Sequence, residues 1–81
     1  MAQLAVTVKD ATTGAALPYV HVEADGVVLT TGLDGAAIFD VPVGSTRTIK
    51  VRNVMFRPWS RSVSISSERV EVTASMEKAI M

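Results

Sequence analysis

The chain has 81 residues, of which 48% are hydrophobic and 20% are charged, and its formal net charge is zero. This composition is typical of one compact domain and excludes the low hydrophobicity and high charge of a disordered chain. The absence of cysteine excludes disulfides, thiolate chemistry and cysteine-based zinc sites. We expect a single domain over residues 1–81, with its core at about 4–76 and a short C-terminal tail at 77–81.

Targeting and membrane-spanning segments are not indicated. No apolar run approaches the roughly 20 residues that a helix needs to cross a bilayer. Residues 1–8 lack the basic start of a signal peptide. We therefore expect no membrane insertion, and synthesis in the cytoplasm if Met1 is the native start.

The first strand and the turn after it are predicted from alternation and turn residues. Apolar side chains occupy alternate positions before Asp10, which predicts a half-buried strand. These inward residues are Leu4, Val6 and Val8. Gly14 supplies the positive φ that a tight reversal often needs, and Pro18 opens the next strand, where no ladder donor is required.

A hairpin is predicted around Asp25-Gly26, with strands at 19–24 and 27–31. Both central positions of a type I′ turn need positive φ, so an Asp-Gly pair between apolar runs is a strong hairpin signal. A second turn at 32–35 precedes the fourth strand. The inward residues of that strand are Ala37, Phe39 and Val41.

The second half of the chain predicts three more strands, at 46–52, 59–66 and 69–76. Their inward positions are Ile49, Val51, Val63, Ile65, Val70, Val72, Ala74 and Met76. Short strands that alternate in this way and are separated by turn residues are typical of an all-β sandwich. We therefore predict an all-β fold, a seven-stranded antiparallel Greek-key sandwich.

The two halves of the chain carry opposite charge. Residues 1–40 have one lysine against five carboxylates, or −4, and residues 41–81 have seven basic against three acidic side chains, or +4. Strands from the two halves interleave in a Greek-key sandwich, so the charges can neutralise each other across the fold. The alternative is an acidic face that meets a basic face of a neighbouring copy.

Short turn segments carry a resemblance to a known family. They are Asp10-Ala-Thr-Thr-Gly14, Leu17-Pro18-Tyr-Val-His-Val22, Thr31-Gly-Leu-Asp34-Gly35 with Phe39, and Pro42-Val-Gly44, and Phe56 stands in the place of a Gly-Tyr pair. In this order they resemble the carboxypeptidase regulatory-like domain, a transthyretin-like module appended to many larger proteins. The resemblance covers roughly residues 4–76 and implies a prealbumin/immunoglobulin-like sandwich.

Catalytic and metal-binding residues are scarce. Acid–base catalysis needs a base beside a nucleophile or a second titrating group, and the only histidine, His21, is expected to be a surface residue of its strand. Asp25 and Asp34 are isolated turn acids and do not have the spacing of calcium ligands. We therefore predict no enzyme activity, no cofactor and no metal site.

The prealbumin-like fold also includes a ureide hydrolase. That resemblance implies several histidines and arginines and a Tyr-Arg-Gly-Ser end. This chain ends Glu77-Lys-Ala-Ile-Met81 instead. The sequence therefore does not predict the hydrolase activity, and the prediction of no enzyme activity is unchanged.

An interface is predicted where aromatic, sulfur-containing and arginine side chains gather. Its residues are Met55, Phe56, Arg57, Trp59 and Arg61. These residue types are enriched at the centres of protein–protein interfaces. The alternative is that Trp59 caps one end of the core, and the sequence leaves both interpretations open.

The function predicted from these features is a non-catalytic structural or protein-interaction module that associates with itself or docks on a larger assembly. The first alternative is a small surface or decoration subunit of a viral or extracellular structure. The second is a binder of carbohydrate or polyanions through an Arg/Trp patch, with a glycan as its partner. Zero net charge argues against nucleic acid as a partner.

Overall fold

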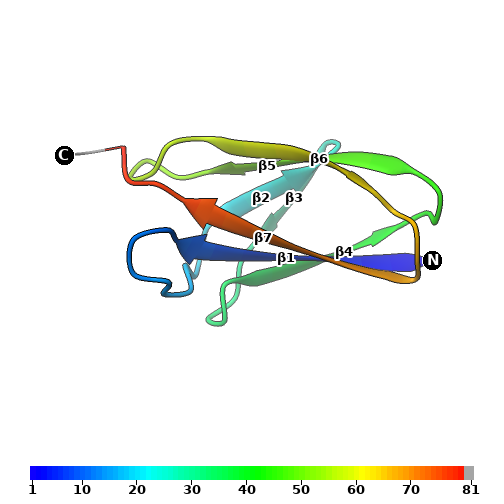
Figure 1. Ribbon diagram of the computed structural model, residues 1–81, viewed down its shortest axis with the longest axis horizontal. Coiled ribbons are helices and arrows are strands. Elements are labelled where there is room, and N and C mark those ends of the chain that lie inside the picture. The colour runs from blue at the N-terminus through cyan, green and yellow to red at the C-terminus, as the bar shows by residue number, and fades with distance from the viewer. Residues whose placement is uncertain (80–81) are drawn as a thin grey trace.

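The computed structural model describes residues 1–79, which form two β-sheets packed face to face (Figure 1). The strands are β1 (Ala2–Asp10), β2 (His21–Ala24), β3 (Val27–Thr30), β4 (Ala36–Val41), β5 (Thr46–Arg52), β6 (Trp59–Ser64) and β7 (Arg69–Met76). One sheet has the order β4-β1-β7 and the other the order β3-β2-β5-β6. The predicted all-β sandwich of seven strands is confirmed.

One strand pairing differs from the predicted antiparallel pattern. The pairs β1–β4, β2–β3, β2–β5 and β5–β6 are antiparallel, whereas β1 and β7 run parallel, with Leu4 opposite Val70. Parallel neighbours cannot be joined by a hairpin and need a long crossover. Here the crossover is the chain between β1 and β7, which contains all four strands of the second sheet and also β4 of the first sheet.

Strand ends agree with the predictions at β5 and β7 and differ at β2, β3 and β6, with β3 one residue shorter than predicted. β2 begins at His21 and not at residue 19, because Tyr19 has a φ of 60° and leaves strand geometry. β6 ends at Ser64, but Ile65 is still buried after it. Its backbone N–H donates to the C=O of Ser45 at 2.9 Å, which holds the chain against the core.

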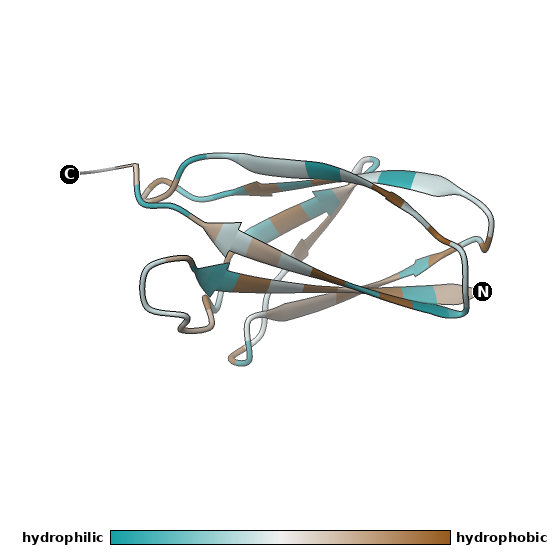
Figure 2. Cartoon of the chain, in the orientation of Figure 1, coloured by the Kyte–Doolittle hydropathy of each residue, from teal (hydrophilic) through white to brown (hydrophobic). Residues whose placement is uncertain are grey.

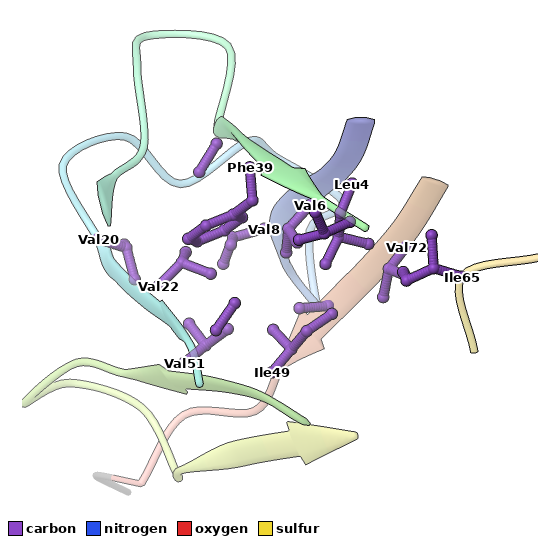
Figure 3. Packing of buried hydrophobic residues seen from close by; sticks show 14 of the residues in the cluster. Leu4, Val6, Val8, Val20, Val22, Phe39, Ile49, Val51, Ile65 and Val72 are labelled. Carbon is purple, nitrogen blue, oxygen red and sulfur yellow. The ribbon is translucent and has the colours of Figure 1, made fainter. Parts of the chain in front are cut away.

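The core lies between the sheets and consists almost wholly of the predicted inward residues. Apolar and polar residues alternate along the strands (Figure 2). Phe39, which is 4% exposed, points into the space between the sheets together with Val8 and Val22 (Figure 3). Of the predicted inward residues, only Val63 and Val70 are partly exposed, and both pack against this core.

The predicted Asp-Gly hairpin is present. Asp25 and Gly26 have φ values of 46° and 92°, so both central positions are left-handed, as a type I′ turn requires. The Asp25 carboxylate also lies 3.6 Å from the guanidinium of Arg47. This ion pair joins the acidic and the basic half of the chain.

Gly35 occupies the most crowded turn. Its φ is 75°, and a Cβ atom added there would lie 2.8 Å from the C=O oxygen of Val8 and 3.0 Å from the Cβ of Ala16. Gly14 has almost the same φ, 76°, but a Cβ there would meet nothing within 4 Å. The two glycines therefore separate the cost of positive φ from the cost of close approach.

We expect Gly35→Ala to destabilise the protein far more than Gly14→Ala. Positive φ alone costs a non-glycine residue about 1 kcal/mol or more, whereas the collision with the β1 backbone adds strain that no rotamer relieves. In a domain of this size about 1 kcal/mol lowers the melting midpoint by about 4–8 °C. Thermal melting that shows equal losses for both variants would mean that the Gly35 turn is looser than described.

Phe39→Ala is expected to cost about 3–5 kcal/mol, because the neighbours of a buried aromatic ring refill its cavity only partly. Ile38→Ala, one residue away and 49% exposed, is the matched control and should cost about 1 kcal/mol or less. Urea denaturation of the two variants measures the difference. The reverse order of stabilities would place the strand register one residue off.

Candidate functional site

The structure divides the predicted interface residues by burial. Phe56 and Trp59 are half-buried and pack against the core, whereas Met55, Arg57 and Arg61 are exposed. The Arg61 guanidinium lies 5.2 Å from the centre of the Trp59 ring, within the range of a cation–π contact. Trp59 thus contacts both the core and a surface cation, and a role for these residues in an interface stays a prediction.

Backbone hydrogen bonds tie the loop before β6 to the residues after β7. The N–H of Arg57 donates to the C=O of Glu77 at 2.8 Å, and the N–H of Ala79 donates to the C=O of Met55 at 3.1 Å. The loop is therefore anchored at the end of the sandwich. Of the predicted short C-terminal tail at 77–81, residues 80 and 81 lie outside the described residues.

A hollow of about 610 Å³ lies on the outer face of the four-stranded sheet, at the end where β2 begins. Its lining consists of Tyr19, His21, Arg52, Asn53, Val54 and Pro58. Small-molecule sites typically have volumes of about 300–1,000 Å³. This hollow is therefore large enough for a compact ligand.

The pairing of β2 with β5 places a histidine beside an arginine on the outer face. His21 lies directly opposite Arg52, and both side chains are exposed. Directly opposite residues in an antiparallel pair have Cβ atoms roughly 4.5–5.5 Å apart, so the two side chains can reach one ligand. The pair exists because the apolar residues beside it, Val22 and Val51, are fully buried and fix the register.

Arg52 is free to bind an anion. In the described part of the chain, the ion pairs are Asp25–Arg47 and Arg69–Glu71, and neither includes Arg52. The lining of the hollow includes no carboxylate. The guanidinium fork matches the geometry of a carboxylate, which it can bind through two parallel hydrogen bonds.

Asn53 completes the polar part of the lining. Its Oδ1 accepts a hydrogen bond from the N–H of Met55 at 2.9 Å, and its backbone C=O accepts one from the N–H of Phe56 at 3.1 Å. The side-chain oxygen is therefore committed to the turn, which leaves the amide NH₂ group as the donor. With His21 and Arg52, the hollow presents several donors to a ligand that carries acceptors.

Tyr19 forms part of the hollow in a conformation that is rare for its residue type. Its φ is 60°, and the residue is 68% exposed. Its N–H donates to the C=O of Thr31, whose own N–H donates to the C=O of Val20, both at 2.9 Å. Tyr19 and Val20 thus lie opposite the single residue Thr31, which is the pattern of a G1 β-bulge. Tyr19 occupies the first position of this bulge, which glycine usually fills.

A second hollow, of about 310 Å³, lies in the seam between β3 and β4 and includes Phe39 in its lining. Its arginine, Arg47, is already paired with Asp25 at 3.6 Å. The seam therefore offers no uncommitted arginine, and we regard the hollow at His21 as the better candidate.

Metal ligands do not gather anywhere in residues 1–79, because no group of three or more histidine or acidic side chains lies close enough to hold an ion. The same residues include no helix of the length and apolarity that would span a membrane.

The sequence predicts the residues of the hollow separately but does not bring them together. His21 is predicted to be a surface residue, which it is, and Arg52 follows the inward Val51, so alternation places it on the outer side of its strand. The missing information was the register between β2 and β5, which are separated by two other strands in the sequence. The outward alternation of both strands was the available signal.

Comparison with known proteins identifies the fold. No protein-family model matches the chain, and no curated protein sequence matches it. The structure is similar to that of Klebsiella pneumoniae 5-hydroxyisourate hydrolase, with a TM-score of 0.76 and 17% sequence identity over 99% of this chain and 93% of that chain. The protein has a transthyretin-like fold.

This similarity corrects the predicted function. A non-catalytic structural or protein-interaction module was inferred from the fold and from the scarcity of catalytic residues, but the same fold here matches an enzyme over almost the whole chain. The prediction and its two alternatives, a surface subunit and a polyanion binder at the Arg/Trp patch, are therefore wrong as conclusions from the fold. At 17% identity the likeness shows the fold alone and does not transfer the reaction.

Proposed function

We propose that the protein binds a small, planar, anionic molecule in the hollow lined by Tyr19, His21, Arg52 and Asn53. The observation that carries this proposal is the cross-strand pair of His21 and Arg52 in a hollow without a carboxylate. Arg52 supplies a charge for an anionic group, and the imidazole and amide supply directed hydrogen bonds. The rings of Tyr19 and Pro58 offer apolar surface for a flat body.

The ligand class follows from the lining. A carboxylate is the simplest group that accepts from the guanidinium fork and from the imidazole at the same time. An aromatic or conjugated ring adds contact with Tyr19 and Pro58. Benzoate carries both features and is therefore a suitable probe, with benzamide as its uncharged counterpart.

We expect benzoate to shift the NMR signals of His21 and Arg52, and to bind more tightly than benzamide. Arg52→Gln should weaken benzoate binding by about tenfold or more, because hydrogen bonds to charged groups contribute about 1.5–3 kcal/mol. Arg69→Gln, on the other sheet, makes the same change of charge and is the matched control. Equal weakening by both variants, or equal binding of benzoate and benzamide, would show that only the net charge acts.

Hydrolysis is a second candidate function, favoured by the structural likeness to a hydrolase and by the presence of His21 inside the hollow. The imidazole could take a proton from a water molecule whose oxygen forms a bond to a ring carbonyl carbon. Arg52 would stabilise the negative charge on the carbonyl oxygen. When the carbon–nitrogen bond breaks, the proton passes from the imidazole to the leaving nitrogen.

The substrate to test is 5-hydroxyisourate, because the enzyme with the similar structure is a 5-hydroxyisourate hydrolase. We expect His21→Gln to lower its turnover by about 100-fold or more if the imidazole acts as the base. The assay follows loss of the substrate's ultraviolet absorbance against the uncatalysed rate, with Arg69→Gln as control. Turnover that is absent from the parent protein, or unchanged in His21→Gln, would exclude this reaction and leave the binding proposal to its own test.

We also propose membership of the carboxypeptidase regulatory-like family. Its support is the turn chemistry that first indicated it, since Gly14, Gly35 and Gly44 all have positive φ. The comparisons support the coarser assignment, a transthyretin-like fold.

A further inference from the structure

We propose that Thr31 is the positioning residue of the ligand site: its buried hydroxyl holds Tyr19 in the left-handed conformation that forms the aromatic wall of the hollow. This inference rests on the proposed function. It starts from the observation that Tyr19 has a φ of 60° at a bulge position that favours glycine. A residue held in such a conformation persists only where the surrounding structure over-determines it.

Thr31 makes four hydrogen bonds to the segment around Tyr19. Its Oγ1 accepts from the N–H of Val20 at 2.9 Å and donates to the C=O of Leu17 at 2.8 Å. Its backbone C=O accepts from the N–H of Tyr19, and its N–H donates to the C=O of Val20, both at 2.9 Å. Thr31 is only 1% exposed, so water does not compete for these bonds.

The bulge itself explains why a hydroxyl is needed at this position. In a regular antiparallel ladder the C=O of Thr31 would accept from the N–H of Val20, but the bulge gives that acceptor to Tyr19. Val20 is 2% exposed, so its N–H has no access to solvent and must find a partner in the protein. The Thr31 hydroxyl supplies that partner and at the same time donates to Leu17.

The stability of the fold therefore does not explain why a tyrosine occupies this strained position. Glycine would adopt the same φ at no steric cost, and a ring that is part of a 68% exposed residue adds little to the core. Tyr19 does lie in the lining of the hollow, together with His21 and Arg52. The positioned ring is therefore expected to select flat ligands over compact anions such as acetate.

The experiment compares Thr31→Val, which removes the hydroxyl at nearly constant shape, with Thr31→Ser, which keeps it. Thr73→Val makes the same chemical change at an exposed site of the other sheet and is the control. Two quantities are measured below the melting midpoint of each variant. They are the ratio of benzoate to acetate affinity and the backbone NMR coupling and shifts of Tyr19 that report positive φ.

We expect Thr31→Val to lose the left-handed signature of Tyr19 and to lower the benzoate-to-acetate ratio by about two- to tenfold, the worth of one aromatic contact. Thr31→Ser and Thr73→Val should keep both. A merely structural role would lower the melting midpoint and leave the ratio unchanged. An unchanged Tyr19 signature or an unchanged ratio in folded Thr31→Val would overturn the role of Thr31.

A second variant keeps the inference testable if Thr31→Val does not fold. Tyr19→Gly should raise the melting midpoint, because it relieves the left-handed strain, and should lower the benzoate-to-acetate ratio, because it removes the ring. A ratio equal to that of the parent would show that Tyr19 is not the wall that Thr31 positions. Failure of the parent protein to bind benzoate would instead overturn the proposed function, which distinguishes the two failures.

Discussion

The rest of the structure depends on the burial of strand β1. It lies between β4 and β7, and its inward residues Leu4, Val6 and Val8 have no exposed surface. Burial of each such side chain contributes about 1.5–3 kcal/mol, which is a large share of the net stability of a domain of this size. The same strand provides the backbone on which the neighbouring turns are held. The packing of the core and the geometry of these turns therefore depend on the same strand.

A chain of backbone contacts links β1 to the candidate site. The N–H of Val8 donates to the C=O of Gly35 at 2.8 Å, and its C=O accepts from the N–H of Leu17 at 2.9 Å. Leu17 in turn accepts from the hydroxyl of Thr31, which holds the bulge at Tyr19. The candidate hollow is thus tied by hydrogen bonds to a strand that lies in the middle of its sheet. That arrangement suits preorganised binding, in which little ordering energy is lost on association.

The fold itself decides little about the activity. A transthyretin-like sandwich matches a hydrolase at 17% identity, and function resides in the side chains that each sequence places on the shared framework. In this chain the register of β2 and β5 places His21 opposite Arg52 on the outer face of the four-stranded sheet. Phe56 and Trp59, which the sequence predicts for an interface, are half-buried and pack partly against the core, and their role in an interface stays a prediction.

The sequence alone determined the number of strands, the inward residues such as Phe39 and the hairpin at Asp25-Gly26, because alternation and turn chemistry are local properties of the chain. Only the tertiary structure decided that β1 and β7 run parallel and that His21 stands opposite Arg52. Those pairings join segments far apart in the chain, and their register follows from how the two sheets bury their apolar faces together. The left-handed conformation of Tyr19 could not be predicted from the sequence either. Hydrogen bonds with Thr31, twelve residues later in the chain, impose a conformation that tyrosine does not favour locally.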